Sequence, residues 1–295
     1  MNSTERMILG NDCIYSGDPE ETGLNRNVLI VGGTGSGKTK SYVEPELMEA
    51  LRVENPNNKC VILTKRDIPD RYIPLFEAAG FTVYDLDLSD SEKGNCCYDP
   101  LAYVKSEEDI SDLAHAIVMA NERKEHSNAD PFWDESSEQL LGAEIGATLM
   151  TKNKPTFADV LNLHFSLKIQ ESGCGITTSL DSLFKTIEKA APDCYAAVCW
   201  KTFREAAAKT AKSIYVSMNP TLRAFTTSIR NNMRNKPPVD FDKFASEKSI
   251  LFITTSPVKK ALHGLANIFV SQAISELFTI CLLYTSPSPR DISGS

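Results

Sequence analysis

The chain has 295 residues, 42% of them hydrophobic, and carries a formal net charge of -8 at pH 7. This length accommodates two domains of ordinary size, and the hydrophobic content is typical of a folded globular protein. The acidic balance excludes general attraction of the whole surface to nucleic acid or to anionic membranes. Any contact with a polyanion must therefore use a local basic patch.

The sequence shows no secretion signal and no obvious membrane span. Residues 1–23 are polar and acidic, without the apolar block of a signal peptide. The most apolar stretch, residues 269–284, is interrupted by Gln272, Ser275 and Glu276, whereas a spanning helix needs about 20 predominantly apolar residues. The eight cysteines include no Cys-x-x-Cys pair, and Cys60 lies in an apolar run. We therefore predict reduced, mostly buried thiols in a soluble, cytoplasmic chain without a transmembrane segment.

A glycine-rich stretch at residues 32–39 is the most informative part of the sequence. It reads Gly-Gly-Thr-Gly-Ser-Gly-Lys-Thr and fits the pattern Gly-x-x-x-x-Gly-Lys-Ser/Thr. The apolar, β-branched run at 27–31 predicts a buried parallel strand before it, and residues 38–51 predict a helix after it. A full pattern in this setting predicts a phosphate-binding loop. The predicted cofactor-binding residues are Gly32, Gly33, Thr34, Gly35, Ser36, Gly37, Lys38 and Thr39.

The chemistry of a nucleoside triphosphate accounts for the residue types in this loop. Glycines let backbone N–H groups approach the phosphates closely, where side chains would obstruct them. Lys38 would neutralise the β and γ phosphates, and the Thr39 hydroxyl would bind Mg2+. We therefore expect ATP and Mg2+ as cofactors, with Lys38 and Thr39 as catalytic residues and Thr39 as the metal ligand. The alternative is a glycine-rich turn that binds nothing, which the complete pattern makes less attractive.

The segments that follow predict an α/β fold. Pro45 should kink or narrow the helix after the loop, because proline lacks a backbone donor. Residues 60–64 and 82–86 predict buried strands, and a helix at 69–79, closed by Gly80, lies between them. Strands that alternate with such helices predict a parallel, doubly wound sheet, with the glycine loop at the carboxyl ends of the strands.

Residues 106–232 predict only helices. Ser106 and Asp109 form a capping box before an apolar helical face, and Thr156 and Asp159 cap a later helix. Further helices are predicted at 133–149, 179–190 and 196–217. We interpret most of this region as an all-α domain inserted into the α/β fold, because residues 249–254 again predict a buried strand and residues 262–278 a helix.

These patterns divide the chain into four parts. Residues 8–104 and 218–280 are predicted to form the two parts of a nucleotide-binding domain. Residues 105–217 are predicted to form the all-helical inserted domain. Residues 281–295 look like the translated adapter sequence that ends many metagenomic reading frames, so we expect a non-native tail.

Three stretches carry a family resemblance: the loop region at 27–39, Tyr-Asp-Pro-Leu-Ala-Tyr at 98–103, and Asp-Pro-Phe-Trp at 130–133. Together they resemble the TraG-like coupling ATPases of type IV secretion systems, over about residues 8–280. The resemblance implies a RecA-like P-loop NTPase with an inserted all-α domain, assembled as a homo-oligomeric ring at the cytoplasmic face of the membrane. It also implies that ATP drives single-stranded DNA, or a relaxase or secreted protein, towards the channel components.

Three features differ from that family. The family's usual Asp-Pro-Lys-Gly after the second strand is here Thr64, Lys65, Arg66 and Asp67. The membrane-spanning helices with which the family usually starts are absent. The acidic Walker B strand should follow the helix at 262–278 and lies beyond residue 280. We therefore expect a fragment that binds ATP without hydrolysing it efficiently, with its catalytic acid outside this sequence.

A basic stripe is a second candidate site. Arg223, Arg230 and Arg234 share one side of a predicted helix, within a region, 201–238, that holds eight basic residues and the single acid Glu205. The stripe could follow DNA phosphates in a ring channel or supply an arginine finger to a neighbour's ATP. We favour a solvated helix face, since basic stripes are common on amphipathic helices.

Aromatic and acidic residues meet at the predicted start of the helix near residue 133. We predict Phe132 and Trp133 as core anchors rather than a base-stacking platform, because an apolar helix follows at once. Carboxylates at a helix start usually act as caps. A metal site or acid–base pair is therefore the less favoured interpretation of His126, Asp130, Asp134 and Glu135.

The leading functional hypothesis is a motor ATPase, in which positioning and charge neutralisation carry catalysis. The first alternative is a nucleotide-gated adaptor that binds relaxase or secreted substrate through the helical domain without translocation. The second is a different P-loop enzyme, such as a small-molecule kinase. The large helical insertion, and the lack of a lid-like arginine cluster next to the loop, make that enzyme less attractive.

Overall fold

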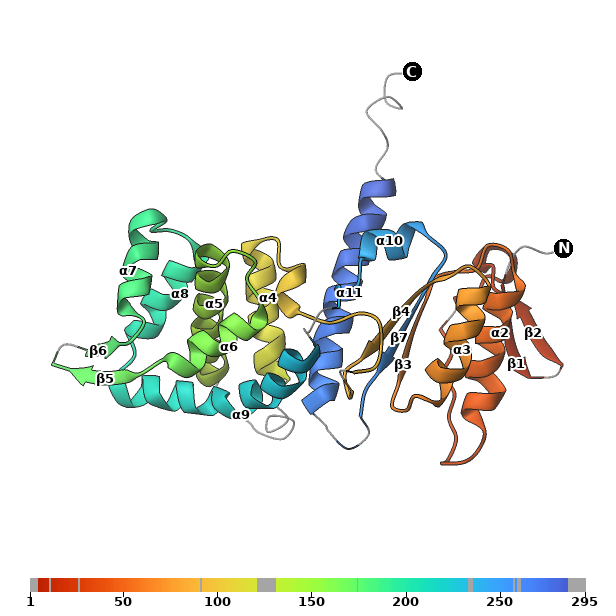
Figure 1. The fold of residues 1–295 in the computed structure, drawn as a ribbon, viewed down its shortest axis with the longest axis horizontal. Helices are drawn as coiled ribbons and strands as arrows, with labels where there is room; N and C mark the ends of the chain where they lie inside the picture. Colours follow the sequence, from red (N-terminus) through yellow and green to blue (C-terminus); the bar gives the residue numbers. More distant parts are fainter. Residues whose placement is uncertain are drawn as a thin grey trace, which may run out of the picture. The chain divides into compact units, whose positions relative to one another are not determined.

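A computed structural model describes residues 5–10, 12–25, 27–90, 92–120, 131–173, 175–232, 236–256, 258 and 261–285 (Figure 1). The chain divides into two compact units. Unit 1 comprises Met1–Asp85 and Asp240–Ile253, and unit 2 comprises Leu86–Val239 and Thr254–Ser295. The architecture is mixed α/β with a parallel sheet, which agrees with the predicted α/β class.

Unit 1 contains a β-hairpin, most of a three-stranded sheet and several helices. The hairpin pairs β1 (Arg6–Gly10) with β2 (Cys13–Ser16). The sheet has the order β3-β7-β4, formed by β3 (Lys59–Leu63), β7 (Ser249–Thr254) and β4 (Thr82–Asp87). The helical elements are α1 (Pro19–Thr22), the π-helix η1 (Thr39–Val43), α2 (Glu44–Arg52), α3 (Asp67–Ala78) and α10 (Phe241–Ser246).

The three strands of this sheet match the strands predicted at 60–64, 82–86 and 249–254. β7 is the central strand, and all its residues are buried. α3 matches the helix predicted at 69–79, and Gly80 follows it with a φ of 78°, the left-handed conformation that commonly ends helices. The rings of Phe76 in α3 and Phe252 in β7 lie 6.1 Å apart, so α3 packs on the sheet.

The segment before the glycine loop departs from the prediction. Residues 27–31 do not form a strand, and Leu29 and Val31 are 87% and 85% exposed. A strand needs a neighbouring strand for its backbone N–H and C=O groups, and none of the strands that the structure describes pairs with these residues. The predicted buried strand is therefore wrong here, because apolar composition does not by itself supply a pairing partner.

β3 lies at the edge of the sheet and keeps one face open. Cys60 is exposed and Ile62 is 52% exposed, although the apolar run predicted a buried strand. The alternate residues Val61 and Leu63 pack against the core, so Cys60 and Ile62 lie on the opposite face of the strand. The prediction of mostly buried thiols holds for Cys96, Cys97 and Cys199. It is wrong for Cys60 and Cys281, which are exposed, whereas Cys13 and Cys194 are partly buried.

The helix after the glycine loop changes type along its length. η1 has π-helical hydrogen bonding, and α2 continues from it with Pro45 in the first turn. Proline has no N–H, so a regular α-helix cannot run through this position with all its hydrogen bonds made. The irregularity takes the form of a π-helical stretch that ends just before Pro45, and not of the kink or narrowing that the proline predicted.

A buried carboxylate attaches the hairpin to α2. Arg52 and Arg6 donate to the Glu49 carboxylate at 2.6 Å and 2.9 Å. These guanidinium groups, Arg52 foremost, hold the pKa of Glu49 well below its ordinary value. The N-terminal hairpin is thereby held against the helix that follows the glycine loop.

Unit 2 is mainly helical. Both predicted capping boxes are confirmed, one at Ser106 and Asp109 and one at Thr156 and Asp159. Its elements, besides the ends of β4 and β7, are the 3-10 helix η2 (Pro100–Tyr103), α4 (Glu107–Met119), α5 (Phe132–Thr151), α6 (Phe157–Ser166), β5 (Ile169–Ser172), β6 (Gly175–Thr178), α7 (Asp181–Ala190), α8 (Tyr195–Arg204), α9 (Ala208–Asn232) and α11 (Ala261–Thr285).

Two features of unit 2 correct the sequence-based expectation. β5 and β6 form an antiparallel hairpin, so the region predicted as purely helical contains strands. These strands are short and polar and lack the apolar alternation that identifies a strand. The helix predicted at 196–217 is two helices, α8 and α9, separated at residues 205–207. The chain turns there through Glu205, Ala206 and Ala207, residues that favour helix and give no sequence signal of a break.

α5 packs closely against α8 because two glycines face it. A Cβ at Gly142 would lie 2.9 Å from the Tyr195 ring, and a Cβ at Gly146 would lie 2.8 Å from the Cβ of Ala196. These glycines are one helical turn apart and therefore share a face of α5. The α5–α8 contact thus depends on the absence of side chains at both positions.

α5 also carries a buried acid that pairs with a histidine. The Glu144 carboxylate lies 2.9 Å from His164 Nδ1, and both side chains are fully buried. Burial raises the pKa of Glu144, and His164 opposes that shift. The remaining polar atoms of the pair, Glu144 Oε1 and His164 Nε2, have no hydrogen-bond partner among the described residues.

The Tyr-Asp-Pro-Leu-Ala-Tyr stretch connects several elements of unit 2. Asp99 Oδ1 accepts hydrogen bonds from the N–H groups of Leu101, at 3.0 Å, and Phe157, at 3.1 Å. Burial raises the pKa of Asp99 to about 6. Tyr98 donates to the Gln272 side chain of α11 at 2.6 Å. This stretch therefore joins η2, α6 and α11.

α11 matches and extends the helix predicted at 262–278. By length and composition, its stretch Leu262–Leu282 is able to cross a membrane, and 33% of that window is buried. The expectation that no stretch is long and apolar enough is therefore corrected. The polar residues within Leu262–Leu282 are too few to lower the mean hydropathy of the stretch below that of a spanning helix. A buried core helix meets the same criterion, and Phe269 of this helix is buried against Tyr98.

Candidate functional site

The glycine loop is an exposed segment of unit 1 that leads into η1. Gly35 and Gly37 have φ angles of 77° and 86°, in the left-handed region that side chains rarely adopt. The Ser36 N–H donates to the Gly33 carbonyl at 3.3 Å, which forms a tight turn inside the loop. The two left-handed glycines therefore permit a backbone that most other residues would strain.

Lys38 reaches back across the start of this loop. Its Nζ donates to the carbonyl oxygens of Gly32, at 2.5 Å, and Gly33, at 2.8 Å. The structure thus brings three of the predicted site residues together around one ammonium group. A phosphate oxygen is a stronger, charge-assisted partner for an ammonium than a carbonyl, so this side chain is placed to exchange one for the other.

Close packing within the loop explains one glycine and leaves another unexplained. A Cβ at Gly32 would lie 2.6 Å from the Ser36 hydroxyl, so any larger residue there would displace Ser36. A Cβ at Gly33 meets nothing within 4 Å. The loop backbone alone therefore does not require glycine at position 33.

The end of the loop is fixed by a serine that the motif does not include. Ser41 donates to the Gly37 carbonyl through its N–H, at 2.8 Å, and through its hydroxyl, at 3.0 Å. This is the usual bond of a helical serine to the carbonyl four residues earlier, and that spacing is the sequence signal that could have identified it. Thr39, the predicted metal ligand, begins η1 and is exposed.

An ion pair links the helix after the loop to α3. Arg71 of α3 donates to the Glu44 carboxylate at 2.9 Å, and the Tyr72 hydroxyl donates to it at 3.2 Å. Arg71 is the main cause of the lowered pKa of Glu44. Sequence spacing gives no sign of this pair, because its members lie on separate helices.

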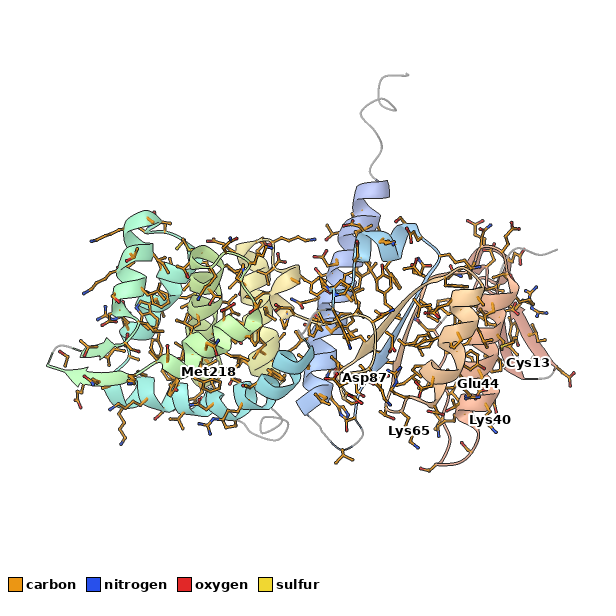
Figure 2. The ribbon with its side chains drawn as sticks, in the orientation of Figure 1. Cys13, Lys40, Glu44, Lys65, Asp87 and Met218 are labelled. Atoms are coloured by element: carbon orange, nitrogen blue, oxygen red, sulfur yellow. The ribbon has the colours of Figure 1, made fainter. Side chains whose placement is uncertain are left out.

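Lys65 and Arg66, which follow β3, adopt two different roles. Arg66 forms a bidentate pair with the buried Asp85 carboxylate, with distances of 2.7 Å and 3.1 Å, and also contacts Asp70 at 3.1 Å. Lys65 is exposed. Figure 2 shows Lys65 on the same side of unit 1, in that view, as Lys40 of η1. Unit 1 therefore presents further cations besides Lys38.

The described residues contain no cluster of three or more His, Cys, Asp or Glu side chains that could hold a metal ion. Of the residues considered for a metal site, Asp134 and Glu135 lie in the first turn of α5, as expected for residues at a helix start. His126 and Asp130 lie outside the described part of the chain.

The predicted core anchors at the start of α5 are half exposed. Phe132 and Trp133 are 44% and 39% exposed, and their rings meet edge to face at 5.4 Å. The prediction is wrong because the buried face of α5 begins one turn later, at Ser137 and Leu140. In the basic stripe, Arg223 is exposed, whereas the side chain of Arg230 and all of Arg234 lie outside the described residues.

Comparison with known protein families gives a match over most of the chain. A family model described as Type IV secretory system Conjugative DNA transfer matches residues 1–282. No curated protein shows significant similarity to the chain. The match covers both units, the glycine loop and the Tyr-Asp-Pro-Leu-Ala-Tyr stretch.

Proposed function

Because the chain belongs to the type IV secretory system conjugative DNA transfer family, we propose that it is a P-loop ATPase that couples ATP hydrolysis to DNA delivery. Its cargo is single-stranded DNA or a protein–DNA substrate, and its destination is the type IV secretion channel. Family membership supports the role in DNA transfer. The glycine loop supports the nucleotide-dependent step.

One observation carries the nucleotide assignment. The ammonium of Lys38 donates to the carbonyls of Gly32 and Gly33, in a loop where Gly35 and Gly37 adopt left-handed backbone angles. Successive N–H groups in such a loop form a concave anion-binding surface, and a helix N-terminus adds a favourable dipole. Lys38 exchanges its carbonyl partners for phosphate oxygens, and Thr39, the first residue of η1, offers its hydroxyl to Mg2+.

The remaining residues position this loop. Ser41 fixes the Gly37 carbonyl, and Glu44 ties the following helix to Arg71 of α3. Bound ATP with Mg2+ supplies the phosphoryl group whose transfer to water releases free energy. We further propose that the full protein forms a homo-oligomeric ring at the cytoplasmic face of the membrane, where relaxase or a secreted protein accompanies the DNA.

A nucleotide-gated adaptor is the second candidate function. The observation that favours it is the unpaired segment at 27–31, because a loop that does not follow a sheet strand is held less rigidly. Catalysis of phosphoryl transfer depends on rigid positioning, whereas binding tolerates a looser loop. On this alternative, ATP binding controls the docking of relaxase or secreted protein without translocation.

ATP turnover with and without single-stranded DNA, measured on a longer version of the protein that includes the catalytic acid expected beyond residue 280, separates the two functions. The coupling ATPase predicts turnover that rises several-fold with DNA and is abolished in Lys38→Ala. The adaptor predicts tight ATP binding with slow turnover that DNA does not change. Absence of both binding and turnover would contradict both functions.

A further inference from the structure

Unit 2 contains a pocket that the nucleotide loop does not use. Its volume is about 510 Å³, and its walls come from the start of α5, the end of α8 and the start of α9, elements labelled in Figure 1. Buried Phe203 and Ile214 line it, and the half-exposed Phe132 forms part of its wall. We call this cavity the α5–α9 pocket. This volume is in the range of pockets that bind drug-sized ligands.

The charged residues of the α5–α9 pocket are all acidic. Glu135 and Glu205 line it and are exposed, and neither has an ion-pair partner among the described residues. No Lys, Arg or His belongs to its described lining. Arg204, although adjacent in sequence, donates to the Ile176 carbonyl at 3.1 Å and lies 3.6 Å from the Asp181 carboxylate. Its charge is therefore directed to other elements of unit 2.

The aromatic residues of this region favour the same kind of ligand. Phe132 is 44% exposed and lines a pocket that carries two carboxylates. An aromatic face attracts cations, and the aliphatic stems of lysine and arginine pack readily on apolar surface. A phosphate group would instead meet the repulsion of Glu135 and Glu205, so the pocket disfavours nucleic acid.

We propose that the α5–α9 pocket binds a basic and apolar segment of a protein partner. An aliphatic side chain, or the methylene chain of a lysine or arginine, packs on Phe203 and Ile214. The ammonium or guanidinium group lies between Phe132 and the carboxylates of Glu135 and Glu205. The pocket is larger than a single small cation and combines an apolar wall with two carboxylates, so we assign it a ligand that carries apolar and basic groups together, a peptide segment. This inference rests on the proposed function, in which the chain meets relaxase or a secreted protein, and it does not require nucleotide at the glycine loop.

Fluorescence anisotropy with defined peptides tests the proposal on the whole chain. One labelled probe is a twelve-residue peptide of alternating leucine and lysine, and the other replaces each lysine with glutamate. We expect the lysine peptide alone to bind. The double variant Glu135→Gln/Glu205→Gln should weaken it about tenfold, since close charge pairs at interfaces contribute on the order of this factor or more.

Matched variants distinguish binding at the pocket from general attraction of the peptide to an acidic surface. Glu171→Gln/Asp193→Asn removes the same charge from two exposed acids outside the pocket, and it should change affinity less than about twofold. Phe132→Ala and the milder Phe132→Leu should both weaken binding, whereas Val198→Ala, at an exposed apolar residue of α8 outside the pocket, should not. Circular dichroism verifies that each variant keeps its helices.

Four outcomes would overturn the proposal. The first is that the lysine peptide does not bind, and the second is that the control pair weakens it as much as the pocket pair. The third is that spermidine binds as tightly as the peptide, which would indicate a free polyamine site. The fourth is that Phe132→Ala weakens a dT20 oligonucleotide but not the peptide, which would indicate base stacking. Lys38→Ala should leave peptide affinity unchanged, so failure of this proposal is distinct from failure of nucleotide binding.

Discussion

The interior of unit 2 and the glycine loop of unit 1 hold their polar groups in opposite ways. In unit 2, Glu144, His164 and Asp99 are buried and held by fixed partners. In unit 1, Lys38 lies in an exposed loop, where its hydrogen-bond partners among the described residues are carbonyls of that loop. Buried polar groups with fixed partners determine a fold, whereas an exposed cation with weak partners is available to a ligand. The comparison predicts large stability effects in the first region and small ones in the second.

The largest expected effect comes from breaking the buried acid–histidine pair. Glu144→Ala leaves His164 buried without its partner and should destabilise unit 2 by about 3–5 kcal/mol. The matched control is Glu138→Ala on the same helix, which removes a pair with the largely exposed His115. Urea unfolding should show little change for the control. Equal losses in the free energy of unfolding for both variants would mean that burial does not distinguish the two pairs.

The next effect concerns the contact between α5 and α8. Gly146→Leu introduces a side chain where even a Cβ would lie 2.8 Å from Ala196. Overpacking should cost about 1–3 kcal/mol in the free energy of unfolding. Gly173→Leu, in a turn where a Cβ meets nothing within 4 Å, is the control. A thermal melt in which both variants unfold at the same temperature would contradict the close α5–α8 approach.

Asp99 gives a prediction that depends on pH. Its pKa is raised from 3.8 to about 6, so between these values the folded protein retains a proton that the unfolded chain releases. The contribution of Asp99 to stability therefore falls as pH rises through this window. Asp99→Asn keeps the acceptor oxygen and does not ionise. In urea unfolding, the free energy of unfolding of this variant, relative to that of wild type, should rise by about 2–3 kcal/mol from pH 4 to pH 7. A difference that stays constant with pH would show that Asp99 is not desolvated.

The smallest effect is expected in the segment before the glycine loop. Leu29→Ser/Val31→Ser changes two side chains that are 87% and 85% exposed, so the free energy of unfolding should change by less than about 0.5 kcal/mol per residue. Phe252→Ser, in the buried strand β7, is the contrasting variant and should destabilise severely. A large loss in the double variant would show that residues 27–31 are buried in a sheet.

Local sequence patterns predicted most of the elements in both units. The capping boxes at Ser106 and Thr156 and the left-handed Gly80 each encode their conformation in a few neighbouring residues, and the structure contains all three. β7 was recognisable because a strand buried on both faces is apolar throughout. These features need no information about distant parts of the chain.

The errors concern features that depend on distant partners. Residues 27–31 have the composition of a strand, but pairing depends on a neighbour that composition does not specify. The same limit applies to Phe132 and Trp133, whose exposure depends on which turn of α5 first meets its neighbours. At the candidate site, the motif identified the loop residues. The Glu44–Arg71 pair could not be predicted from sequence spacing, because its members lie on separate helices.

Calorimetric titration with ATP in the presence and absence of Mg2+ tests the central claim most directly. The account predicts magnesium-dependent binding that Lys38→Ala weakens at least about tenfold, since a charged hydrogen-bonding group is worth about 1.5–3 kcal/mol. Lys40→Ala, which removes an equal charge from an exposed neighbour, should change the affinity much less. No magnesium-dependent binding, or an affinity that Lys38→Ala leaves unchanged, would contradict the assignment of residues 32–39 as a nucleotide-binding loop.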